Sequence, residues 1–327
     1  MSRALIQGAR ARLGLKMVLL AVFVVLSALA YQFSFVNPKI FSYAMSLRAP
    51  RLAVMLTAAF AISASAIVFQ TVIRNTIVTP CLLGMNALYL LIHTAVCFAL
   101  GASSVLIVNP LLAFGFDVLV MGIVATYVYY SIFRRTGGNV LYVLLIGTVL
   151  TTFFSSIQST LTRIMDPNEY DALLTMLVAD FTNVNAAVLL PGIVLIALIG
   201  WCLRADLAQL DVISLGREAA VGLGVDYERA LRRLLVGVAL CIAVATALVG
   251  PLSFLGLITA NVARQLLKTY RHGYLIVGSS LVGMAMLTAG QFLVERVMNY
   301  GVPVSVFVTI GGGLYFLYLI LFAFRTR

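Results

Sequence analysis

The segment Gly250-Pro-Leu-Ser-Phe-Leu-Gly-Leu-Ile-Thr-Ala-Asn-Val-Ala-Arg264 places glycines and a proline inside an almost entirely apolar chain, and a short apolar run follows the interruption. Irregular backbone at membrane depth persists only where protein or a water-filled pathway satisfies its amides, and such broken segments are typical of transport proteins. No ionisable residue lies between Gly250 and Asn261. We therefore interpret the segment as a hinge-like packing element rather than as an ion or substrate site.

The composition of the whole chain supports a membrane environment. Hydrophobic residues make up 62% and charged residues 10% of the 327 residues, and the mean hydropathy is +1.08. Such a chain has too little polar surface to cover a water-soluble globule. We predict an all-α polytopic membrane protein with one transmembrane domain over residues 1–327 and about ten transmembrane helices. The predicted spans are 16–36, 51–73, 82–101, 110–133, 139–161, 186–203, 231–250, 258–268, 274–295 and 303–323.

The 22 basic residues predict how these spans are oriented. Placing both termini in the cytoplasm and alternating through ten spans leaves five basic residues outside, namely Lys39, Arg48, Arg51, Arg163 and Arg296. The other seventeen then lie inside, as the positive-inside rule requires. A single crossing over 231–268 would move Lys268 and Arg271 outside, so a short return through 258–268 fits better. The basic excess is therefore explained by topology rather than by nucleic-acid binding.

Catalytic and metal-binding patterns are absent from the sequence. It contains neither a phosphate-binding G-x-x-x-x-G-K-[ST] motif nor H-E-x-x-H. The four cysteines (Cys81, Cys97, Cys202 and Cys241) and the two histidines (His93 and His272) show no ligand-like spacing. We expect no enzymatic activity, no metal site and no cofactor on this chain, so any ATP and magnesium would be bound by a partner ATPase.

Intramembrane acids test the alternative of an ATP-independent secondary carrier. Asp117 is the only acid well inside a predicted span, and Glu295 lies at a span end. Proton relays need such groups, and a local hydrogen-bonded role explains Asp117 better. Secondary transport is disfavoured but stays open.

The longest stretch predicted to be cytoplasmic covers about residues 204–230. It contains Leu215-Gly-Arg-Glu-Ala-Ala-Val-Gly-Leu-Gly-Val225, whose small residues allow close approach of another backbone. We predict two short helices with a glycine turn, suited to docking on a soluble partner. The alternative is a solvated loop that only anchors the topology.

Several motifs together resemble a known family. Arg48-Ala-Pro-Arg51, Gln70, Arg74-Asn75, Pro80-Cys-Leu-Leu-Gly84, the segment around Leu215 and the break at Gly250 occur in order from about residue 45 to the C-terminus. In this combination they resemble the FecCD-type permeases of ATP-binding cassette (ABC) importers for iron-siderophores, haem and vitamin B12.

The resemblance implies a vitamin B12 importer-like permease fold in the bacterial plasma (inner) membrane, with a second permease, cytoplasmic ATPases and an extracytoplasmic substrate-binding protein as partners. It also implies that residues 215–225 couple the permease to the ATPase. The predicted coupling residues are Leu215, Gly216, Arg217, Glu218, Ala219 and Gly224.

Arg48 and Arg51 match the outward arginines of the family, which face acidic residues on the binding protein. A guanidinium pairs bidentately with a carboxylate and steers docking from a distance. The alternative is interfacial anchoring at a helix start, where Pro50 favours the first turn.

The chain also departs from the family pattern. Thr76 and Ile77 stand where the family has Pro-Leu, and Ala260-Asn261 replaces Pro-His. Gln291, Glu295 and Arg296 likewise differ, and Arg296 is left unassigned. These features look most like the ferric catecholate branch, in which two different permeases pair. A homodimer and a haem or vitamin B12 substrate stay as alternatives.

Pathway residues are the weakest predictions. Gln70, Asn86 and Gln158 are polar side chains on apolar spans that could line a translocation path. Hydrogen bonding between helices is the commoner role for such residues. The sequence does not identify the particular siderophore.

Overall fold

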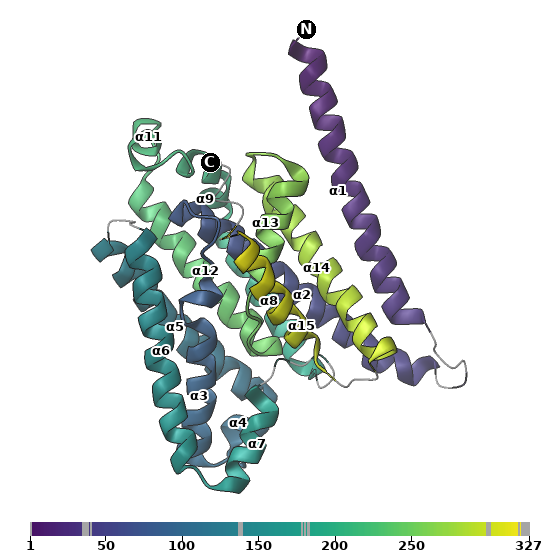
Figure 1. Ribbon diagram of the computed structural model, residues 1–327, viewed down its shortest axis with the longest axis vertical. Coiled ribbons are helices and arrows are strands. Elements are labelled where there is room, and N and C mark those ends of the chain that lie inside the picture. The colour runs from purple at the N-terminus through teal and green to yellow at the C-terminus, as the bar shows by residue number, and fades with distance from the viewer. Residues whose placement is uncertain are drawn as a thin grey trace.

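The computed structural model is built of helices joined by short connections (Figure 1). It describes residues 2–34, 39, 41–136, 140–177, 179, 181, 184–298, 302–319 and 321. No strand occurs among these residues. Ten helices coincide with the ten predicted spans: α1 (Ser2–Phe33), α2 (Phe41–Ile73), α3 (Met85–Leu100), α5 (Pro110–Thr136), α6 (Val140–Ile164), α8 (Ala186–Cys202), α12 (Tyr227–Val249), α13 (Leu255–Leu267), α14 (His272–Val297) and α15 (Val304–Tyr318).

Their length and apolarity suit a membrane. Within the described residues, six helices (α1, α2, α5, α6, α12 and α14) are long and apolar enough to cross a bilayer, and α3, α8 and α15 are shorter apolar helices. A bilayer core about 30 Å thick needs roughly 20 helical residues. The chain therefore folds as an all-helical, multi-pass membrane protein, as predicted.

The central helices differ from the peripheral ones in burial. In the most apolar window of α2 and of α12, 67% of residues are buried inside the chain, and in α14 the share is 56%. The corresponding shares are 6% for α1 and 11% for α6. Helices that are apolar all round are buried in a core or face lipid. We infer that α2, α12 and α14 form the core, with α1 and α6 at the periphery.

Small residues bring the core helices close together. A Cβ atom built on Gly283 of α14 would lie 2.5 Å from Ser63 Oγ of α2, and one on Gly256 of α13 would lie 2.9 Å from the Ala66 Cβ of α2. Lipid offers no hydrophobic driving force for helix association, so such close packing supplies the attraction instead.

The broken segment has the predicted form of a turn and a short returning helix. Gly250 ends α12 with φ +84°, and Phe254 precedes α13 with φ +60°. Helix α13 then runs back toward the end of the molecule at which α12 begins (Figure 1), and it packs against α2, α14 and α15.

Helix α2 begins ten residues earlier than the predicted span and includes Pro50 in its interior. The alternative interpretation, in which Pro50 lies in a first helical turn, is therefore wrong on this point. The N-terminal extension of α2 lies against the end of α1, where Arg48 binds three backbone carbonyls. This contact stabilises a helix that the proline alone would disfavour.

Short helices lie at the two ends of the bundle. Helices α9 (Arg204–Ala208), α10 (Leu210–Ile213) and α11 (Arg217–Gly222) form one end, which we call the α11 end, and α1 starts toward it. Helices α4 (Val105–Val108) and α7 (Pro167–Leu177) lie at the other, the α7 end (Figure 1). The short 3₁₀ helix η2 (Pro80–Leu83) precedes α3.

Candidate functional site

Helix α11 protrudes from the α11 end between two glycine turns. Gly216 has φ +106° and Gly224 has φ +84°, values that side chains disfavour. Three large apolar side chains around α11 are exposed: Leu215 by 59%, Val221 by 55% and Leu223 by 64%. The arrangement leaves an apolar knob on the surface, a feature that marks interaction sites.

The structure brings the six predicted coupling residues together on and beside α11. Leu215, Arg217, Glu218, Ala219 and Gly224 are exposed. Gly216 differs because it is buried, so it faces the chain itself rather than solvent. Three short helices occupy 204–222 where two were predicted, because the chain makes an additional helical turn at α10.

Gly216 is buried against Arg74, a residue absent from the predicted coupling set. A Cβ atom on Gly216 would lie 2.9 Å from Nη1 and 3.3 Å from Cζ of Arg74. Arg74 follows the end of α2 with φ +58°. The Arg74-Asn75 motif was the available sequence signal, but nothing in it indicated which glycine the guanidinium meets.

Two ion pairs beside the knob, at the start of α12, are exposed. Arg217 Nε lies 3.2 Å from Glu228 Oε1 and Arg229 Nε lies 3.0 Å from Asp226 Oδ2, with more than half of each side chain exposed. Exposed pairs of this kind contribute about 0–1 kcal/mol. Their charges therefore remain available to a partner at little cost.

Two acidic residues attach the segment of short helices α9 to α11 to neighbouring helices. Asp211 of α10 accepts hydrogen bonds from the backbone N–H (2.8 Å) and from ring Nδ1 (2.6 Å) of His272 at the start of α14. Partial burial disfavours its ionised form, but these bonds outweigh that effect and lower the pKa of Asp211. Asp206 of α9 lies 3.9 Å from Arg233. Burial raises the pKa of Asp206, and Arg233 opposes this only in part.

Both predicted docking arginines belong to α2, and Arg48 contacts the end of α1 that lies away from α11 (Figure 1). Arg48 Nη1 donates to the carbonyls of Tyr31, Gln32 and Ser34 at 3.1–3.2 Å. Arg296 Nη2 donates to the Ser34 carbonyl at 2.7 Å. Cations at a helix C-terminus satisfy its last carbonyls and oppose its dipole.

Arg51 lies one turn beyond Arg48 on α2 and is partly exposed. Docking by Arg48 and Arg51 stays a prediction. The contacts of Arg48 give it a structural role at the end of α1 as well.

The three predicted pathway residues lie in different places. Gln70 is buried and donates to the Thr76 carbonyl at 2.8 Å, while Arg264 lies 3.5 Å from its Oε1. Asn86 donates to Ser253 Oγ at 2.9 Å, and Gln158 is partly exposed on α6. The Gln70–Arg264 contact joins α2 to α13, whereas the bonds to Thr76 and Ser253 run to connecting segments. A role in the pathway stays a prediction for all three.

Asp117 has the local hydrogen-bonded partner that the sequence left unnamed. Its Oδ2 lies 3.0 Å from His93 Nε2, joining α5 to α3, and both side chains are largely buried. Tyr89 packs on the His93 ring at a centroid distance of 4.3 Å. The contact supports a structural role, since buried polar groups in membranes pair with one another.

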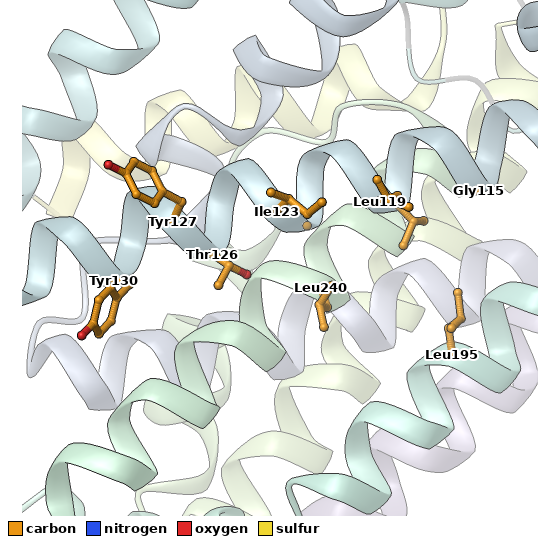
Figure 2. Close-up of a pocket in the computed structure, with 10 residues that line it drawn as sticks. Gly115, Leu119, Ile123, Thr126, Tyr127, Tyr130, Leu195 and Leu240 are labelled. Atoms are coloured by element: carbon orange, nitrogen blue, oxygen red, sulfur yellow. The ribbon is translucent and has the colours of Figure 1, made fainter.

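An open groove of about 720 Å³ lies between α5, α8 and α12. Figure 2 shows Leu119, Ile123 and Tyr127 of α5 on its lining, together with Leu195 of α8 and Leu240 of α12. None of its lining residues is ionisable in the physiological range. The groove offers no charged ligand to a polar solute.

Comparison with known proteins agrees with this architecture. The sequence profile of the FecCD transport family matches residues 12–322. The petrobactin import system permease protein YclO of Bacillus subtilis (strain 168) is 39% identical over 279 residues, covering 85% of this chain and 89% of the relative. FatC, a petrobactin import system permease protein of Bacillus anthracis, is 32% identical, covering 82% and 75%.

A more distant relative and a solved structure extend the comparison. The ferric enterobactin transport system permease protein FepG of Escherichia coli (strain K12) is 27% identical, covering 84% of this chain and 82% of the relative. A metal-chelate type ABC transporter solved in an inward-facing conformation matches with a TM-score of 0.75 at 22% identity, covering 93% of this chain and 98% of that one. The structural match shows a shared fold.

Proposed function

Because the chain belongs to the FecCD transport family, we propose that it is the membrane-spanning permease subunit of a binding-protein-dependent ABC importer for an iron-siderophore complex. The observation that carries this proposal is the apolar knob around α11, which is exposed at one end of the helical bundle. The relatives named for petrobactin and ferric enterobactin support a siderophore as the substrate class.

The energy for transport comes from a partner chain in this proposal. A cytoplasmic ATPase binds ATP and magnesium and closes during its cycle, while this chain supplies the path and the lever. The knob of Leu215, Val221 and Leu223 docks in a groove of the ATPase, and Arg217 and Glu218 align it. Gly216 acts from within, because its missing side chain lets α11 pack onto Arg74.

The end of the bundle opposite the α11 end receives the loaded binding protein. Arg51 pairs with an acidic residue of that protein, and Arg48 supports it while holding the end of α1. This orientation places the α11 end and both termini in the cytoplasm of a bacterial inner membrane. It follows the positive-inside distribution of the basic residues.

A second permease completes the path. We propose a heterodimer with a homologous permease, on the basis of the departures at Thr76, Ala260 and Gln291. Purification of the tagged chain in mild detergent, followed by identification of the proteins that accompany it, distinguishes the two arrangements. Recovery of this chain as the only permease would contradict the heterodimer.

Reconstitution tests the function directly. Proteoliposomes that contain this chain and its partners should take up a ferric siderophore only when ATP and the loaded binding protein are present. The double variant Val221→Asp with Leu223→Asp should lose ATPase association and uptake, because each carboxylate would be desolvated in an apolar contact.

A matched control is Ile164→Asp, which places a carboxylate on an equally exposed apolar residue (67%) toward the α7 end. It should keep ATPase association. Full association and uptake in the Val221/Leu223 variant would contradict the coupling assignment.

A further inference from the structure

A single carboxylate oxygen ties α10 to α14. Asp211 Oδ1 accepts from both the backbone N–H and the ring Nδ1 of His272, at 2.8 and 2.6 Å. The two residues are 61 positions apart in sequence. The His272 side chain is 7% exposed and that of Asp211 is 48% exposed, so one partner is buried in the bundle and the other reaches toward solvent.

The backbone bond places the carboxylate at a helix N-terminus. His272 is the first residue of α14, and Arg271, its N-cap residue, makes no side-chain capping bond. Asp211 therefore caps α14 from another element, and its negative charge meets the positive end of the helix dipole. The cap holds α10 and the first turn of α14 in one geometry.

The end of α13, just before this turn, is held by a contact of its own. Lys16 Nζ of α1 donates to the Leu266 carbonyl at the end of α13, at 2.6 Å. Lys268 ends α13 with φ +48°, and α14 begins four residues later. Movement of Asp211 would therefore act on a short, constrained turn that joins the half-length helix α13 to the core helix α14.

The other polar contacts of the segment lead elsewhere. Among the described residues, Asp206 pairs with Arg233 and Arg217 pairs with Glu228, and both partners lie on α12. Helix α12 is the segment's own continuation along the chain. The close approach of Gly216 to Arg74 reaches the end of α2. Asp211 thus provides the direct polar contact to α14.

We propose that Asp211 and His272 are positioning residues that carry movement of the ATPase-docked segment to the α13–α14 turn, and so couple ATP hydrolysis to opening of the transport path. The inference rests on the proposed function and deepens it. Docking of the ATPase needs the α11 knob, whereas transmission needs the Asp211–His272 contact. The two roles therefore separate by experiment.

The experiment uses the complete transporter in proteoliposomes and measures ferric siderophore taken up per ATP hydrolysed. Asp211→Ala and His272→Ala should keep ATPase association and hydrolysis, while uptake per ATP falls about tenfold or more, in the range of site–site couplings. The double variant should be no worse than Asp211→Ala alone, because that variant already removes both hydrogen bonds, whereas His272→Ala removes only the ring bond and keeps the backbone N–H.

Conservative and control variants sharpen the result. His272→Asn places an amide N–H where ring Nδ1 stands, so it should restore much of the uptake per ATP that His272→Ala loses. Arg204→Gln removes an exposed cation that lies 4.3 Å from the centroid of the Trp201 ring, at the start of α9, and should leave the ratio unchanged.

Each outcome decides the proposal. A wild-type uptake-to-ATP ratio in both alanine variants overturns it, and so does additive loss in the double variant. If the alanine chains do not accumulate in the membrane, Asp211→Leu and His272→Leu take their place, and an unchanged ratio there overturns it equally. Absence of ATP-dependent uptake by the wild-type transporter would instead contradict the proposed function.

Discussion

Two carboxylates of the loop between α8 and α12 lie in opposite surroundings. Asp206 is 6% exposed, and Arg233 Nη1 lies 3.9 Å from its Oδ2. Asp211 is more exposed and receives two hydrogen bonds from His272. Burial raises the pKa of Asp206, whereas the bonds to His272 lower the pKa of Asp211 despite its partial burial. Ionisation of Asp206 should therefore destabilise the fold, and ionisation of Asp211 should stabilise it.

We expect Asp206→Asn to raise the melting temperature at pH 7 by roughly 1–3 °C. A folded-state pKa above the unfolded value means that ionisation disfavours the folded chain, and this cost is present above the folded pKa. The amide removes it. Thermal scans of the detergent-solubilised chain at one fixed scan rate, followed by Trp201 fluorescence, measure the shift. A lower melting temperature at pH 7 would show that the Arg233 contact dominates.

We expect Asp211→Asn to lower the melting temperature at pH 7 by a similar amount, roughly 1–3 °C. A lowered folded-state pKa gives stability above the unfolded pKa, and this stability is lost as the pH falls through the folded pKa. The difference between variant and wild type should therefore shrink in acid. A difference that stays constant from pH 7 down to pH 3 would contradict the assignment.

At the scale of the element, helix contacts depend on glycine where backbones approach. A Cβ atom on Gly283 would meet Ser63 Oγ at 2.5 Å, Thr259 Cγ2 at 3.3 Å and the Ala59 carbonyl at 3.4 Å. All three neighbours are in the buried interface of α14 with α2 and α13. The contact has no room for a methyl group.

Gly283→Ala should therefore destabilise the chain by about 1–3 kcal/mol through overpacking. The matched control is Gly313→Ala on α15, where a Cβ would meet nothing within 4 Å. The control gains helix propensity, worth about 1 kcal/mol, and should melt at or above the wild-type temperature. Equal melting of the two variants would show that α14 shifts to accommodate the methyl group.

The elements illustrate what the sequence can predict. The spans followed from apolar length because a bilayer demands about 20 helical residues, and the return through α13 followed from the positions of Lys268 and Arg271. The start of α2 was mispredicted because Arg48 and Pro50 look like a boundary. The contacts of Arg48 with the end of α1 depend on how the two helices pack.

The candidate site was predicted unevenly for the same reason. The α11 residues lie close in sequence, so their grouping was readable from one segment. The Gly216–Arg74 and Asp211–His272 contacts join residues that lie far apart in the chain. No local periodicity encodes such pairs, so the three-dimensional arrangement was needed to find them.

At the scale of the whole molecule, α11 and α7 mark opposite ends of the bundle (Figure 1). We expect a cysteine at Leu223 to react with a membrane-impermeant maleimide only after cells are opened, and a cysteine at Ile164 to react in intact cells. Both positions are exposed, by 64% and 67%. The unmodified chain, with its exposed Cys202, provides the background. The reverse labelling pattern would show that the chain has the opposite orientation in the membrane.

The half-length helix α13 has a consequence for how the chain is made. Its 13 residues rise about 20 Å, which is less than the roughly 30 Å of a hydrocarbon core. If α13 left the insertion machinery without a partner helix, its ends would be stranded in lipid. We therefore expect α12 and α13 to enter the bilayer together as a hairpin. An in-vitro insertion assay in which α13 integrates without α12 would contradict this. Synthesis as far as Leu267 would then be a checkpoint, with the nascent chain held at the ribosome-bound channel until both arms have emerged.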